Sequence, residues 1–312
     1  MILRHLVSAF ALGLAISASP LAAHAQTDAV ATESASWEDV TYANPEGLEL
    51  LARIYRPHSA EGPLAVVISV HGGAWGAYDR TSGRVYDQAL ADAGYLVVAI
   101  DFRQSPDYQH PAGSADVTAA VRWVRLNADA LNADPEQIGL IGSSSGGHLA
   151  LLAAVRPDNE AHLGTPIAGA SDGCAPHDEI DASVDYVVAM WPVSSPITRY
   201  RYAQRAGVDQ LVTLTERYFA DEDAMWDASI PRIVQAGEAE DLPPILVIQP
   251  GMDSNIPQDM TFDLLQAWQA RSGKVDYAFY PGAPHAFGHY PSENTEDMLA
   301  AITSFIDRQL AD

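Results

Sequence analysis

The feature that most constrains this fold is a series of apolar, β-branched runs that alternate with segments of helical spacing. A run that is apolar at nearly every position is typical of a strand buried on both faces, as in a parallel sheet. Such alternation favours a mostly parallel sheet with helices on both faces and right-handed crossovers. The runs occupy residues 63–72, 95–102, 137–143, 184–192, 244–251 and 275–282, and the helical segments occupy 82–93, 112–131, 145–155, 257–272 and 293–310.

Two more strands are expected before these runs, at 37–43 and 48–57, with Asn44, Pro45 and Gly47 turning the chain between them. A short turn of this kind predicts an antiparallel pair. The chain of 312 residues, with 48% hydrophobic and 19% charged residues, is able to bury a large core. We therefore expect one α/β domain over residues 26–312, with a sheet of about eight strands.

The N-terminus has the pattern of a secretory signal peptide. Arg4 precedes an apolar stretch from Leu6 to Ile16, and small residues flank His24 just before Gln26. The apolar stretch is too short to span a bilayer comfortably, which disfavours the alternative of an uncleaved membrane anchor. Residues 1–25 are therefore predicted to be removed on export, leaving a periplasmic or secreted protein with no membrane span.

Charge and cysteine content exclude several classes of protein. With 41 acidic and only 17 basic residues, the formal net charge of −24 argues against a nucleic-acid partner. Cys174 is the single cysteine, so no intramolecular disulfide is available, and it is interpreted as a loop thiol. The histidines show no repeated ligand spacing, and we expect neither a metal nor a cofactor.

The strand and helix rhythm is interrupted between the runs at 184–192 and 244–251. Residues 195–242 form a long insertion that follows a core strand. Open α/β folds place their binding sites at the carboxyl ends of the strands, so an insertion there is predicted to act as a cap over that edge. The alternative is a surface excursion unrelated to substrate. The insertion carries the aromatic residues Tyr200, Tyr202, Tyr218, Phe219 and Trp226.

A nucleophile motif lies where one apolar run ends and a helix begins. Residues 142–146 read Gly-Ser-Ser-Ser-Gly and fit the pattern G-x-S-x-G. In a strand–turn–helix context the flanking glycines allow a tight, strained turn that exposes the central hydroxyl. Ser144 is therefore the predicted nucleophile. The backbone N–H of Ser145 would face the reacting centre at the start of the helix.

A serine nucleophile needs a base and an acid, which in this architecture follow it along the chain. His285 follows the last predicted strand and is the expected base, with His289 as the nearest competitor. Asp253 follows the preceding strand and is the expected acid, which would fix the tautomer of the imidazole. Asp259 and Asp263 are weaker candidates for the acid.

A glycine loop after the first buried run completes the set. Residues 70–76 read VHGGAWG. Glycines after a buried strand allow backbone amides to approach a ligand, as an oxyanion hole requires.

The ordered motifs HGGAW, DFRQSP, GSSSGG, GMDSNIP and PHAF resemble those of α/β-hydrolase esterases of the hormone-sensitive-lipase type. They are most similar to the exported group related to bifunctional feruloyl and acetylxylan esterases, over roughly residues 45–310. The resemblance implies that the amides of Gly73 and Ala74 join that of Ser145 in the oxyanion hole. It also implies an Asp101–Arg103 pair after the second run. Ala74 replaces the third glycine of the HGGG pattern and resists positive φ.

These residues predict a serine carboxylesterase that acts on short acyl or aromatic esters, either small molecules or esters linked to polysaccharide. Two alternatives remain at this point. One is an arylformamidase, another amidase or a peptidase that uses the same three residues, since arylformamidases share a similar HGGxW motif. The other is a noncatalytic binding protein built on the same fold.

Overall fold

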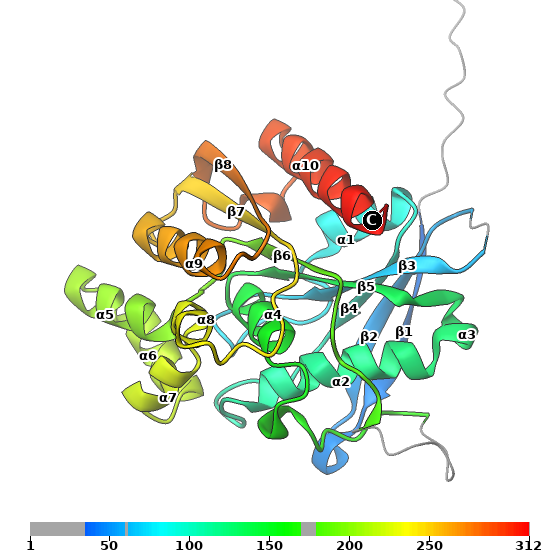
Figure 1. The fold of residues 1–312 in the computed structure, drawn as a ribbon, viewed down its shortest axis with the longest axis horizontal. Coiled ribbons are helices and arrows are strands. Elements are labelled where there is room, and N and C mark those ends of the chain that lie inside the picture. Colours follow the sequence, from blue (N-terminus) through cyan, green and yellow to red (C-terminus); the bar gives the residue numbers. More distant parts are fainter. Residues whose placement is uncertain (1–34, 60–61, 170–178, 312) are drawn as a thin grey trace, which may run out of the picture. The chain divides into compact units, whose positions relative to one another are not determined.

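The computed structural model describes residues 35–59, 62–169 and 179–311. The predicted signal peptide and Cys174 lie outside these ranges. The described chain forms an eight-stranded sheet in the order β1-β2-β4-β3-β5-β6-β7-β8 (Figure 1). The strands are β1 (Ser36–Ala43), β2 (Leu50–Arg56), β3 (Leu64–Val70), β4 (Leu96–Ile100), β5 (Ala133–Ser143), β6 (Tyr186–Met190), β7 (Ile245–Met252) and β8 (Val275–Pro284).

The pairing of the strands agrees with the sequence patterns. β1 pairs antiparallel with β2, and β2 pairs antiparallel with β4, whereas the five remaining neighbours are parallel. The central strands β4 and β6 are buried at every position, which explains their continuous apolar runs. The prediction of an eight-stranded, mostly parallel sheet is confirmed.

Helices cover both faces of this sheet. Helices α1 and α10 pack on one face through residues such as Leu90 and Ile302, and α2, α4, α8 and α9 pack on the other (Figure 1). The helices are α1 (Arg84–Asp92), α2 (Ala112–Leu126), α3 (Ala128–Leu131), α4 (Ser145–Val155), α5 (Pro196–Ala206), α6 (Asp209–Tyr218), α7 (Glu222–Asp227), α8 (Ile230–Ala236), α9 (Gln258–Ala270) and α10 (Glu293–Leu310), with 3-10 turns η1 (Pro45–Gly47), η2 (Glu160–His162) and η4 (Phe287–His289).

The segment predicted as an insertion divides into two parts. Helix α8 packs against the core through Ile230, Ile233 and Val234, so it is the crossover helix between β6 and β7. Helices α5 to α7 lie outside α8 at one end of the sheet (Figure 1). Helix α8 therefore belongs to the layer that covers the sheet, and the cap role stays a prediction for α5–α7.

Local chemistry sets where these elements begin and end. The Ser195 hydroxyl accepts a hydrogen bond from the backbone N–H of Thr198, and Pro196 occupies the first turn of α5. The segment 112–131, predicted as one helix, breaks at Asn127 into α2 and α3.

Within the described ranges, no helix has both the length and the apolar character needed to cross a membrane.

Candidate active site

Three of the predicted site residues lie directly after the carboxyl ends of strands. Ser144 follows β5, Asp253 follows β7 and His285 follows β8. The Nε2 atom of His285 lies 3.2 Å from Oγ of Ser144, and its Nδ1 lies 2.7 Å from Oδ2 of Asp253. The fold thus joins three side chains that are up to 141 positions apart in the sequence.

The Ser144 turn combines strain at the serine with close packing at the glycines. Ser144 has φ 53° and ψ −116°, a region that costs a side-chain-bearing residue about 1–3 kcal/mol. Gly142 and Gly146 do not have positive φ. They are required because a Cβ at Gly142 would clash with the carbonyl of Gly146, and one at Gly146 would clash with the carbonyls of Val70 and His71. The strain predicted for this turn therefore falls on the serine itself.

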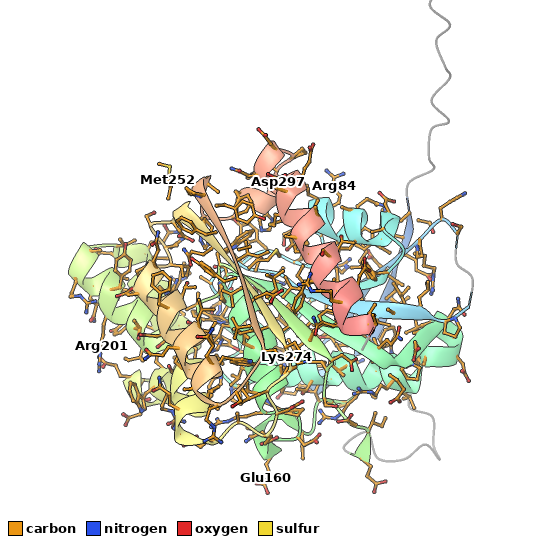
Figure 2. All side chains as sticks on the ribbon, turned by 45° about the horizontal axis from the view of Figure 1, so that its top comes forward. Arg84, Glu160, Arg201, Met252, Lys274 and Asp297 are labelled. Carbon is orange, nitrogen blue, oxygen red and sulfur yellow. The ribbon has the colours of Figure 1, made fainter. Side chains whose placement is uncertain are left out.

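Asp253 is oriented by its own backbone turn. Its Oδ1 accepts hydrogen bonds from the N–H groups of Asn255 at 2.7 Å and Ile256 at 3.0 Å, which leaves Oδ2 for His285. The Asp253 side chain is 1% exposed, whereas the preceding Met252 is 69% exposed and projects outward at the tip of β7 (Figure 2). A carboxylate only accepts, so Nδ1 of His285 carries the proton and Nε2 faces Ser144 as an acceptor.

The glycine loop after β3 contains three successive residues with positive φ. Gly73, Ala74 and Trp75 have φ values of 110°, 50° and 59°. Ala74 thus adopts the conformation that its side chain was expected to resist. In the part of the chain that the structure describes, the N–H groups of Gly73 and Ala74 donate no hydrogen bond, and they are free to bind an oxygen. The N–H of Trp75 instead donates to the Ser145 hydroxyl at 3.2 Å.

Trp75 anchors this loop in the protein interior. Its fully buried indole donates from Nε1 to Nδ1 of His148 at 3.3 Å, and Nε2 of His148 donates to the carbonyl of Ala228 at 3.0 Å. The indole also stacks on Tyr218 and meets the edge of Phe219, with ring centroids 5.4 Å and 5.1 Å away. The insertion therefore contacts the loop that holds the candidate oxyanion donors.

Burial lowers the pKa values of two groups next to Trp75. Burial lowers the pKa of His148 to about 4, so the ring is neutral near pH 7 and keeps the two hydrogen bonds described above. Arg199 on α5 is also buried, with its guanidinium carbon 5.2 Å from the Trp75 ring centre and its Nη2 donating to Thr215. Burial lowers the pKa of Arg199 to about 10.

The Asp101–Arg103 pair that the resemblance implied is wrong, because each of the two side chains binds another partner. Asp101 accepts hydrogen bonds from the backbone and guanidinium of Arg80, and Arg103 pairs with Asp116 on α2, with Nη2 to Oδ1 at 2.7 Å. Asp116 is fully buried, and a buried carboxylate is costly unless a cation pairs with it. Arg103, in the loop that follows β4, supplies that cation.

The alternative candidates for the base and the acid do not contact Ser144 or His285 through a hydrogen bond among the described residues. Nδ1 of His289 donates to the carbonyl of Ser82 at 2.9 Å, and Asp259 and Asp263 are exposed on α9.

Sequence reasoning missed the contacts of the Ser145 side chain, Tyr218 and Phe219 with Trp75. The adjacent aromatic residues at 218 and 219 were the only signal for the last two, since their contact with Trp75 is not local.

Across the described residues, no three His, Cys, Asp or Glu side chains come together to hold a metal ion.

The chain is similar in sequence to several curated esterases. The chain is 28% identical to esterase LipC of Mycobacterium tuberculosis over 256 residues, which cover 79% of this chain and 59% of that protein. It is 37% identical to carboxylesterase NlhH of the same species over 108 residues, 34% of each chain. The chain spans between 54% and 62% of the length of three curated mycobacterial relatives that it matches.

Solved structures establish the fold. A hyperthermophilic esterase from Pyrobaculum calidifontis superposes with a TM-score of 0.70 at 24% identity, covering 89% of this chain and 87% of that one. Esterase Est2 from Thermogutta terrifontis gives 0.67 at 22% identity, covering 89% and 95%. The fold is therefore the α/β-hydrolase fold that the motifs implied. Residues 52–268, well over half of the sequence, match the BD-FAE family model, and the chain belongs to the BD-FAE family.

Proposed function

We propose that the protein is a serine carboxylesterase with Ser144 as nucleophile, His285 as general base and Asp253 as the group that orients His285. The observation that carries this proposal is the unbroken series of contacts from Ser144 Oγ to His285 Nε2 and from His285 Nδ1 to Asp253 Oδ2. His285 would take the Ser144 proton as Oγ attacks the ester carbonyl, and Asp253 would stabilise the imidazolium. Return of that proton to the alcohol releases it and leaves an acyl-enzyme, which water then hydrolyses.

The negative oxygen formed in this attack needs fixed donors. We assign that role to the backbone N–H groups of Gly73, Ala74 and Ser145. The first two have no partner among the described residues, and Ser145 is the first residue of α4, where the helix itself leaves N–H groups free. Loss of one such donor costs about 3–4 kcal/mol of barrier in serine hydrolases.

Ester rather than amide substrates are favoured by the curated relatives, which are named as esterases or as a carboxylic ester hydrolase. Short acyl or aromatic esters, free or linked to polysaccharide, are the proposed substrate class, in keeping with the BD-FAE family match. We also propose export through removal of residues 1–25. Sequencing the N-terminus of the protein recovered from the exporting cell tests this, and a mature chain beginning at Gln26 is expected.

Hydrolysis of 4-nitrophenyl acetate tests the main proposal. The purified protein is expected to hydrolyse this ester and to be labelled once by a fluorophosphonate, with both properties lost in Ser144→Ala and kept in Ser304→Ala on the exposed side of α10. A protein that cleaves the amide 4-nitroformanilide faster than the ester would be an amidase. A folded protein whose Ser144 resists the label would be a binding protein.

A further inference from the structure

A group of buried polar side chains lies behind the Ser144 turn, on the sheet face covered by α1. Its members come from four different elements. Ser69 of β3 pairs in register with Ile141 of β5, so Ser143, two positions further along β5, projects from the same face as Ser69. The group consists of Tyr55, Ser69, Tyr86, Asp87 and Ser143, all buried.

Most polar atoms of this group have no hydrogen-bond partner among the described residues. They are both carboxyl oxygens of Asp87 and the hydroxyls of Tyr55, Tyr86 and Ser143. The hydroxyls of Ser69 and Ser143 nevertheless lie close enough to Tyr86 to influence its pKa, and Ser69 lies close to Asp87 in the same way. Small rotations of these side chains would therefore connect them. Buried polar groups are otherwise costly, since each loses its hydrogen bonds to water.

Among the residues that the structure describes, no cation shifts the pKa of Asp87. Arg84 on the same helix is exposed to solvent (Figure 2), and Arg53 of β2 is paired with Asp39. The charge of Asp87 raises the pKa values of Tyr55 and Tyr86, and no charged group from η4 or α10 shifts the pKa of Asp87. Burial raises the pKa of Asp87 to about 7, and the Ser69 hydroxyl lowers it only in part.

We propose that Asp87 is a positioning residue that keeps its proton and donates it as a hydrogen bond within this group of hydroxyls, thereby holding Ser143 and the adjacent Ser144 turn. A neutral carboxyl group has one donor and several acceptor sites, which matches a group made otherwise of hydroxyls. An ionised carboxylate could only accept, and it would bury an unpaired charge. The effect on catalysis rests on the proposed esterase function, whereas the protonation of Asp87 does not.

The first turn of α1 and the residues just before it also contact the loop that carries His285. The carbonyl of Ser82 accepts from His289, and the ring of Tyr86 meets that of His289 edge-on with centroids 5.4 Å apart. Gly83 packs against the carboxyl group of Asp87, because a Cβ at this position would lie 2.6 Å from Oδ2 of Asp87. The group that contains Asp87 thus meets the turn of the nucleophile at Ser143 and the loop of the base through Tyr86.

The pH dependence of unfolding tests the protonation without any assay of activity. A carboxyl group whose pKa is raised by folding stabilises the native state most at low pH and loses that contribution as the pH rises toward 7. Between pH 5 and pH 8.5 the unfolding constant of the wild type should therefore rise relative to that of Asp87→Asn by at least about tenfold. Asp92→Asn, which removes an exposed carboxylate from the same helix, should follow the wild type. Parallel curves for the wild type and Asp87→Asn would overturn the proposal.

Kinetics with 4-nitrophenyl acetate test the positioning role. Asp87→Leu should lower kcat at pH 6.5 by about tenfold with KM little changed, and Asp87→Asn should restore most of it, since an amide both donates and accepts. In the wild type and Asp92→Asn, kcat should decline above pH 7 as Asp87 ionises, and Asp87→Asn should lack this decline. If Asp87→Leu does not fold, the comparison of these pH profiles decides.

The two sets of measurements separate the proposals. A wild type that hydrolyses no ester contradicts the proposed function, while the unfolding curves still report on Asp87. An active wild type whose kcat is the same in Asp87→Leu, or whose pH profile is unchanged in Asp87→Asn, contradicts the positioning role.

Discussion

The rings of Trp75 and Tyr218 lie parallel, with an angle of 3° between them and their centroids 5.4 Å apart. Trp75 belongs to the loop after β3 that offers the candidate oxyanion donors, and Tyr218 is the last residue of α6 in the insertion. Both side chains are fully buried. The insertion is therefore part of what holds the glycine loop in its strained conformation.

Tyr218→Ala should disturb both stability and turnover. Removing a buried aromatic ring costs about 3–5 kcal/mol of unfolding free energy, measured by denaturant titration. Because Trp75 loses one wall of its site, kcat for 4-nitrophenyl acetate should fall about tenfold. Tyr218→Phe keeps the ring and is the matched control, with kcat close to wild type. Equal kcat in the Ala and Phe variants would show that the stack does not support the loop.

Asp253→Asn should lower kcat strongly while the protein stays folded. The amide is the same size, but it does not hold the Nδ1 proton as a carboxylate does, so His285 can present the wrong tautomer to Ser144. A loss of about 10³- to 10⁴-fold in kcat is expected, as for the equivalent change in a serine protease. Asp259→Asn on the exposed side of α9 serves as the control. A loss of less than tenfold in Asp253→Asn would remove Asp253 from the mechanism.

Ala74→Gly should be tolerated and should not lower the unfolding free energy. Ala74 has φ 50°, and a residue with a Cβ pays about 1 kcal/mol or more in this region. Glycine relieves that strain, which offsets the extra freedom it gives the unfolded chain. Ala300→Gly, at an exposed position within α10, should cost about 1 kcal/mol by the ordinary helix penalty. Equal losses for the two variants in denaturant titration would contradict the strain at Ala74.

Gly146→Ala should prevent the native packing of α4 against β3. The added methyl group would clash with the backbone carbonyls of Val70 and His71, which cannot rotate away. We expect a loss of more than about 4 kcal/mol in unfolding free energy, or a chain that does not fold. Gly282→Ala, where a Cβ would have open space and φ is not in the positive region, should be neutral within about 0.5 kcal/mol. A stable Gly146→Ala protein would show that α4 can move away from β3.

Local pattern was enough to predict the strands and the three candidate residues at their ends, because each is defined by a few adjacent positions. The apolar run before Ser144 and the glycines around it are one example. The partners of side chains from distant segments were not predictable in this way. Arg103 reaches Asp116 on the following helix rather than its near neighbour Asp101, since the buried carboxylate of Asp116 needs a cation. The contacts of Trp75 with Tyr218 and Phe219 depend on how the insertion folds back.

Acid should destabilise the protein through its buried histidines. Burial lowers the pKa of His110 to about 3, and those of His148 and His162 to about 4, against 6.5 for an exposed imidazole. These rings bind protons more readily in the unfolded chain, so native stability is complete above pH 6.5 and falls as the pH drops toward 4. Asp87, with its raised pKa, acts in the opposite direction, so the contribution of a single histidine must be isolated by substitution.

His110 offers that substitution, because its Nδ1 has no partner within the described chain and its ring lies 5.3 Å from that of Phe219. His110→Phe fills similar space with an aromatic ring that takes up no proton. Between pH 6 and pH 4.5 its unfolding free energy should fall less steeply than that of the wild type, by up to about 1.4 kcal/mol per pH unit. Denaturant titrations at several pH values measure the two slopes, with His58→Gln at an exposed position as the control. Identical slopes in the wild type and His110→Phe would mean that His110 binds its proton as readily in the folded protein as in the unfolded chain.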